Sequence, residues 1–389
     1  MKNKTCSSEK ITMDSEADQP LLQPHEQEKQ EPNFQTKSPE MGFHLKARFG
    51  QVILNLKQLK SLEILQAAIQ IFTSNMKYML LMVFSAIPFF IFMVFFEIEL
   101  QKAVYVSHSL LKPVSHYYYD SYSLSYVYDD ISNRGRAVLH LVLELCALHL
   151  VVYPLLELLS SSVIIKIAAK VYAAEKESSL KEVIPDILSH MNVTLKGCLS
   201  TSFWVQLLST STLVGLFWIV ANYVLISGWK NWLSYYYYYD HYSYMEPEVL
   251  MNPLSALLHA LAFFAVLYKY LDWSALWNMG MVISVMEEET GIEALEMSSY
   301  YAKRCRRTGF DLMLGFFAYG TVLRVPCMVV IGKLDAGVGG VMVTAIAVGF
   351  VCLGNLVKWI ALVLYFYDCK AQTLQKKVDE EVGKGHDAC

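Results

Sequence analysis

The residues in this chain whose types could support chemistry are ionisable side chains placed inside long apolar runs. Glu144 and Glu157 lie in the second such run, Arg324 lies in the fifth, and Lys358 lies in the sixth. An unpaired charge at the centre of a membrane costs roughly 2.5–3.5 kcal/mol on insertion scales, so such groups usually face one another or a transported substrate. They therefore indicate either ion pairs that fix helix packing or a path for a proton or a small solute.

Depth in the membrane suggests how these charges pair. If the chain starts on the cytoplasmic side, the second run crosses inward and the fifth crosses outward, which places Glu144 and Arg324 both in the outer third. The sixth run crosses inward again and brings Lys358 to the level of Glu157, in the inner third. We predict two intramembrane ion pairs, Glu144 with Arg324 and Glu157 with Lys358, which requires the three helices to be neighbours.

Motifs for catalysis, metal binding or a cofactor are absent from the sequence. It contains no Gly-x-Ser-x-Gly, no His-Glu-x-x-His and no Gly-rich phosphate loop. His140 and Glu144 are one helical turn apart, but Glu157 and His149 point to other faces of an ideal helix, so a metal site would lack ligands. We expect no enzyme activity, no cofactor and no metal.

Six apolar runs would position these charged side chains. Of the 389 residues, 54% are hydrophobic and only 17% are charged, with a mean hydropathy of +0.33. Soluble domains carry about 25% charged residues, and a helix needs about 20 mainly apolar residues to cross a bilayer. The predicted spans are residues 78–96, 138–165, 200–226, 254–286, 310–331 and 341–367.

Amphipathic segments precede three of these spans. Residues 62–80, 180–199 and 291–313 each run from an amphipathic helix through polar or basic residues into an apolar run. This pattern repeats weakly and indicates three units, each made of an amphipathic helix followed by a helical hairpin. We therefore predict an all-α polytopic membrane bundle of six transmembrane helices with amphipathic helices on its cytoplasmic face.

Basic residues are concentrated on one side of the predicted bundle. Most lie before the first span, between the second and third, between the fourth and fifth, and after the sixth. The positive-inside rule then places both termini in the cytoplasm. The expected location of the protein is an endomembrane or the plasma membrane. We predict a disordered cytoplasmic tail at residues 1–50, because it is polar and lacks apolar periodicity. A membrane domain at residues 51–369 and a short cytoplasmic tail at residues 370–389 follow.

Two loops on the outer side are rich in tyrosine, at residues 117–128 and 235–244. Tyrosine favours the membrane interface, where its ring is buried and its hydroxyl stays hydrated, so anchoring at the interface is the first interpretation. The second is an external binding surface with nearby carboxylates as cation ligands: Asp120, Asp129, Asp130 and Asp240, together with His241.

The stretch from residue 277 to 307 carries the most distinctive pattern in the chain. It ends in a basic cluster that we expect to contact anionic lipid headgroups, namely Lys303, Arg304, Arg306 and Arg307. Its motif residues are Trp277, Gly280, Val282, Ser284, Val285 and Glu287, followed by Gly291, Ile292, Ala294, Leu295 and Ser298.

This pattern resembles a family of plant six-span membrane proteins. More distantly, it is similar to bacterial YciC-type inner-membrane proteins and to the membrane domain of some glycerophosphoryl diester phosphodiesterases. The resemblance covers about residues 55–370. Where that family has a Gly/Lys-rich turn, this chain has Tyr300 to Cys305. The resemblance implies a six-span fold and a membrane location, and it provides no catalytic residues.

The sequence thus predicts a non-enzymatic membrane scaffold or regulator whose partners are the lipid bilayer and other membrane proteins, with no role in nucleic-acid binding. The alternative is a transporter of a small solute or lipid that uses the intramembrane charges.

Overall fold

The computed structural model describes residues 60–74, 76–111, 136, 138–172, 180–239, 253–287, 289–331 and 338–386, all in the unit Ile53–Cys389. These residues form helices joined by turns and include no strand. The predicted tail at residues 1–50 and most of the two tyrosine-rich segments lie outside the described residues. The named helices are α2 (Ser61–Ser74), α3 (Met76–Leu111), η1 (Leu148–Val152), α5 (Tyr153–Tyr172), α6 (Leu180–Tyr239), α7 (Pro253–Met286), α8 (Ile292–Ala302), α9 (Arg306–Ile331) and α10 (Val338–His386).

Five stretches among the described residues are long and apolar enough to cross a membrane, as expected for a multi-pass membrane protein. The sixth predicted span, residues 310–331, coincides with α9, a 26-residue helix that is not among those five. The five stretches are Met76–Val104, Val138–Tyr172, Leu195–Ile226, Pro253–Met286 and Gly339–Lys376.

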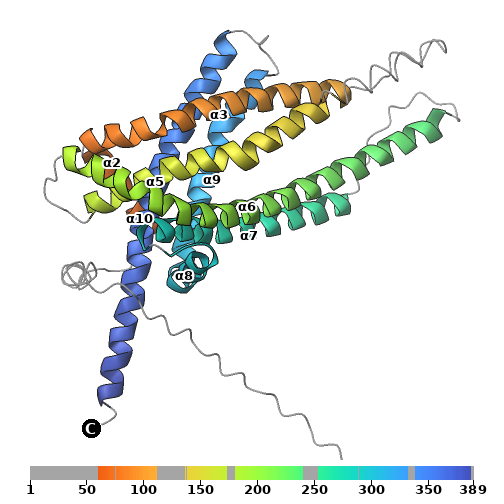
Figure 1. The fold of residues 1–389 in the computed structure, drawn as a ribbon. Coiled ribbons are helices and arrows are strands. Elements are labelled where there is room, and N and C mark those ends of the chain that lie inside the picture. Colours follow the sequence, from red (N-terminus) through yellow and green to blue (C-terminus); the bar gives the residue numbers. More distant parts are fainter. Residues whose placement is uncertain are drawn as a thin grey trace, which may run out of the picture. The chain divides into compact units, whose positions relative to one another are not determined.

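The long helices pack as sequence-adjacent pairs, α3 with α5, α6 with α7, and α9 with α10 (Figure 1). The middle of α10 lies at the centre of the packing, in contact with α2, α3, α5, α7, α8 and α9. Its residues from Trp359 to Cys369 are all buried, and Ile360, Ala361 and Leu362 have no exposed surface. Because the large side chains Trp359, Tyr365 and Phe366 lie in this segment, α10 provides the core around which the other helices are arranged.

Three predicted boundaries differ from the structure, and in each case the helix is longer than predicted. The predicted loop after residue 96 is helical to Leu111, because residues 97–111 contain neither Gly nor Pro. The predicted amphipathic segment at residues 180–199 does not form a helix separate from the span that follows it, because α6 is continuous from Leu180 to Tyr239. α10 likewise continues past residue 369 to His386, so the predicted C-terminal tail begins inside a helix.

The motif residues of α7 and α8 lie where these helices approach α6 closely. A Cβ at Gly280 would come within 2.8 Å of Leu295 Cδ2 and 3.6 Å of the Ala294 carbonyl oxygen, so α8 packs closely against α7 here and the Leu295 side chain would have to move to admit a larger residue. Ser284 of α7 contacts α6 through its carbonyl oxygen, 3.3 Å from Cys198 Sγ. Gly291 starts the turn into α8 with a φ of +67°, and its N–H donates to Thr201 Oγ1 at 2.8 Å. The pattern therefore has a structural explanation in close packing.

We predict that replacing Gly291 with alanine destabilises the protein by about 1–3 kcal/mol, because a residue with a Cβ rarely adopts this backbone conformation. The measurement is denaturant unfolding of the full chain in detergent. Gly315→Ala in α9 is the matched control, since a Cβ there meets no atom within 4 Å. Equal unfolding midpoints for the two variants would contradict the assigned role of Gly291.

Candidate functional site

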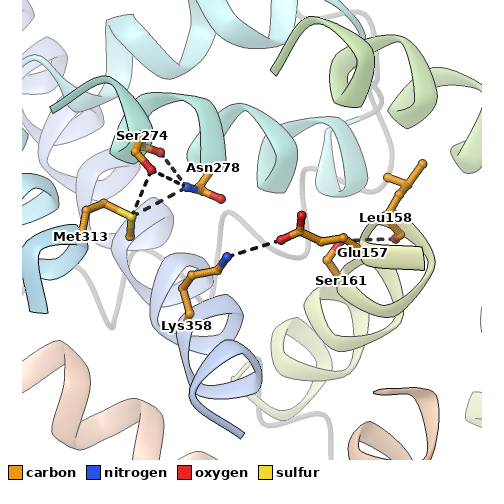
Figure 2. Close-up of polar contacts among 7 residues, drawn as sticks. All are labelled: Glu157, Leu158, Ser161, Ser274, Asn278, Met313 and Lys358. Carbon is orange, nitrogen blue, oxygen red and sulfur yellow. Dashed lines mark hydrogen bonds and ion pairs between the residues drawn. The ribbon is translucent and has the colours of Figure 1, made fainter. Parts of the chain in front are cut away.

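The charged side chains Glu157 of α5 and Lys358 of α10 lie together between the membrane helices (Figure 2). Glu157 Oε1 and Lys358 Nζ are 3.5 Å apart, and the two side chains are only 21% and 19% exposed. Tyr153 lies one turn before Glu157 on α5, and its ring packs against those of Phe89 and His149. The lysine also lies against a ring, with its Nζ 4.7 Å from the centroid of Trp359. Each charged group therefore has a polar or aromatic neighbour, and both side chains are largely buried.

The helix that carries Glu157 is irregular just before it. Residues Leu148–Val152 form a single π-helical turn, and the N–H of Tyr153 bonds to the carbonyl of Leu148, five residues earlier. Pro154 follows directly and has no N–H of its own, so regular α-helical bonding is interrupted at this point. Such π-helical turns are rare and occur frequently at functional sites.

The π-helical turn brings a histidine against α6. Gln206 Nε2 lies 3.4 Å from both the carbonyl oxygen of His149 and His149 Nε2. This polar contact between α6 and η1 lies about two helical turns before Glu157, within the same apolar stretch.

A second set of polar contacts, between α7 and α9, is drawn with the ion pair in Figure 2. Asn278 Nδ2 donates to the carbonyl oxygen of Ser274 at 2.7 Å and to its hydroxyl at 3.1 Å. The same nitrogen lies 3.7 Å from the sulfur of Met313 on α9. Because α5, α7 and α10 are mutually in contact, the polar side chains of α7 belong to the same part of the bundle.

Glu144 and Arg324 are not brought together. Both side chains are exposed and described, and no hydrogen bond or ion pair joins them. Instead, Arg324 lines a small cavity together with Glu97 of α3 and Cys327 of α9. The described contacts of α9 are with α2, α3, α7 and α10. Equal depth in the membrane therefore did not by itself identify the partner of Arg324.

The predicted lipid-binding cluster divides into two parts. Arg306 donates from Nε to Asp272 Oδ1 at 2.7 Å and from Nη2 to Oδ2, so its guanidinium binds the α7 carboxylate through two bonds. Lys303, Arg304 and Arg307 are exposed and have no ion pair with another described residue. The sequence marks Asp272 as an ionisable residue in an apolar run, but only the fold shows that its partner is Arg306.

A further ion pair close to this turn joins the end of α7 to α10, between Glu287 and Lys370. The neighbouring carboxyl of Glu289 has its pKa raised, first by burial and then by the charges of Glu293 and Glu287. The α7–α8 corner is therefore locally acidic, whereas the α8–α9 turn is basic.

Comparisons with family models, with curated proteins and with solved structures find no match to this chain. No group of His, Cys, Asp and Glu among the described residues could hold a metal ion. The candidate site is therefore interpreted from its own geometry, as charge pairs within the helix bundle and a basic turn at its edge.

We predict that Glu157→Gln and Lys358→Gln each destabilise the protein by about 3 kcal/mol, because each leaves a charge without its partner in a desolvated place. The double variant is expected to lose less than the sum of the two. Detergent unfolding measures the three values. The control is the corresponding cycle at Glu99 and Lys102, a pair at 2.6 Å whose lysine is 59% exposed. That exposed pair should give a coupling of about 0–1 kcal/mol, and a cycle at Glu157 and Lys358 with no larger coupling would contradict the prediction.

Proposed function

We propose that this protein is a non-enzymatic membrane scaffold or regulator that binds anionic lipids at its cytoplasmic face and engages partner membrane proteins. The observation that carries the proposal is the α8–α9 turn, where Lys303, Arg304 and Arg307 are exposed directly beside membrane helices. Each basic residue near an anionic membrane surface contributes about 1 kcal/mol of attraction. Because Arg306 is bound to Asp272, three of the four basic side chains are available to lipids.

The proposed topology has six spans with both termini in the cytoplasm. α9 supports it by length, since its 26 residues extend about 39 Å, longer than the ~30 Å hydrocarbon core. The basic residues at its start, Arg306 and Arg307, favour the cytoplasmic side for that end. The resemblance to plant six-span membrane proteins is consistent with this arrangement. The membrane itself is proposed to be an endomembrane or the plasma membrane.

The surface proposed for partner proteins is the apolar face of α6 and α7. These helices expose large side chains, among them Phe217 at 72%, Trp218 at 66% and Phe264 at 64%. In a membrane such a face contacts either lipid chains or the helices of another protein, and small neighbouring residues let helices approach closely. Gly215 has no atom within 4 Å of a Cβ position and lies on this part of α6.

A transporter is the second candidate, and the irregular helix around His149 is the observation that favours it. Transporters place ionisable side chains beside broken helices near the middle of the membrane. Here the π-helical turn Leu148–Val152, Pro154 and the Glu157–Lys358 pair occur within one span. The substrate would be a proton, a small solute or a lipid that competes for these charges.

We predict that the triple variant Lys303→Gln, Arg304→Gln, Arg307→Gln weakens binding of the full chain to lipid nanodiscs that contain phosphatidylserine. The expected loss is about 3 kcal/mol, or about a hundredfold in affinity. Binding is measured with detergent-solubilised protein and lipid nanodiscs with and without the anionic lipid. Arg306→Gln is the matched control: it should lower stability while anionic-lipid binding persists. Unchanged lipid binding in the triple variant would refute the lipid role of the turn.

For the transporter alternative, proteoliposomes containing the full chain should show proton or solute flux that the double variant Glu157→Gln, Lys358→Gln abolishes. The double variant is the suitable comparison because both charges are removed together and the bundle stays neutral at this site. Flux equal to that of empty liposomes, or unaffected by the double variant, would eliminate this alternative and leave lipid binding untouched.

A further inference from the structure

Glu97 is a buried side chain in an apolar stretch of α3, and one of its two carboxylate oxygens has no hydrogen-bond partner among the described residues. It lies in α3, inside the apolar stretch Met76–Val104, and is only 1% exposed. Its Oε1 is buried and makes no hydrogen bond within the structure. A buried polar atom without a hydrogen-bond partner destabilises the folded state, and more so when it is charged. A molecule that donates a hydrogen bond to this oxygen would remove that destabilisation.

The structure has space for such a molecule next to Glu97. A cavity of about 10 Å³ lies between α3, α9 and α10, and this is close to the volume needed for the centre of one water molecule. Its polar lining consists of Glu97, Arg324 and Cys327, and the remaining lining is apolar, for example Met93 and Val348. The cavity thus combines the size of one water molecule with the charged groups that would hold it.

Arg324 provides the second partner for a bound water molecule. Glu97 and Arg324 have opposite charges and line the same cavity, yet no ion pair or hydrogen bond joins these two described side chains. Arg324 and Cys327 are about one turn apart on α9, and Glu97 lines the same cavity from α3. Opposite charges separated by more than direct contact distance are commonly joined through water, at nearly the enthalpy of a direct bond.

We propose that this cavity binds one water molecule, which donates to Glu97 Oε1 and accepts from the Arg324 guanidinium to form a water-mediated ion pair. Arg324 then has its counter-charge on α3, and not on Glu144. Val348 at this cavity and Lys358 are ten residues apart on α10, so the water-mediated pair and the Glu157–Lys358 pair are about 15 Å apart along one helix. The site does not depend on the proposed lipid binding.

The first test asks whether water reaches Cys327. In the full chain in lipid nanodiscs, a variant that keeps only Cys327 is transferred to D2O, and exchange of the S–H group is followed by infrared spectroscopy. The matched control keeps only Cys352, which is 7% exposed, does not line the cavity and packs in an apolar cluster with Phe89 and Phe92. A bound water molecule predicts exchange at Cys327 about tenfold faster than at Cys352. Equal rates would overturn the proposal, because opening of the bundle would expose both thiols.

The second test measures whether Glu97 and Arg324 act as a pair. Unfolding constants are compared for Glu97→Gln, Arg324→Gln and the double variant, and again for Glu144→Gln with Arg324→Gln. The proposal predicts a coupling of about tenfold in the first cycle and none in the second. Additive effects in the first cycle, or coupling in the second, would overturn it. The exchange experiment keeps Glu97 and Arg324 unchanged, so it decides the question even if these variants fail to fold.

Discussion

A charged side chain inside a membrane has no water to solvate it, so it needs a partner of opposite charge or a polar neighbour. The arrangement of this helix bundle depends on where such partners are provided. Lys358 lies on α10, the helix that six other helices contact, and its carboxylate partner Glu157 comes from α5. Removing such charges from water is costly, so the pair is stable only where packing brings both groups together. This contact therefore fixes the register between α5 and α10. The π-helical turn lies directly before the helix segment that carries Glu157.

Close packing meets a different requirement at the α6–α7–α8 corner. Gly280 allows α8 to pack closely against α7. Gly291 turns the chain into α8 through a positive φ, a backbone conformation that favours glycine. At this corner the helices are held by short contacts between small residues, whereas farther along α6 and α7 large apolar side chains are exposed. In hydrocarbon there is no hydrophobic force between helices, so small residues that allow close approach take over this role. The most distinctive sequence pattern in the chain thus encodes the joint between three helices.

Ion pairs also fix the ends of the helices. Arg306 at the start of α9 binds Asp272 of α7, and Lys370 of α10 binds Glu287 at the end of α7. Both contacts join segments that are far apart in the sequence and attach α9 and α10 to α7. The basic turn between α8 and α9 is consequently held in place by Arg306, while its other cations stay exposed. The basic cluster therefore has a structural part and a part that is available to ligands.

The sequence alone determined the all-helical fold and the approximate limits of five membrane helices, because apolar runs of sufficient length and helical periodicity are local properties. Depth along the runs also led to the pairing of Glu157 with Lys358, whose charged atoms lie 3.5 Å apart. Only the tertiary structure decided that Arg324 and Glu97 line the same cavity, since the sequence places Glu97 in the loop after the first predicted span and contains nothing about which helices are neighbours. The position of a charged residue within its apolar run determines its depth in the membrane. Its partner is determined by which helices pack side by side, and this depends on contacts between residues far apart in the chain.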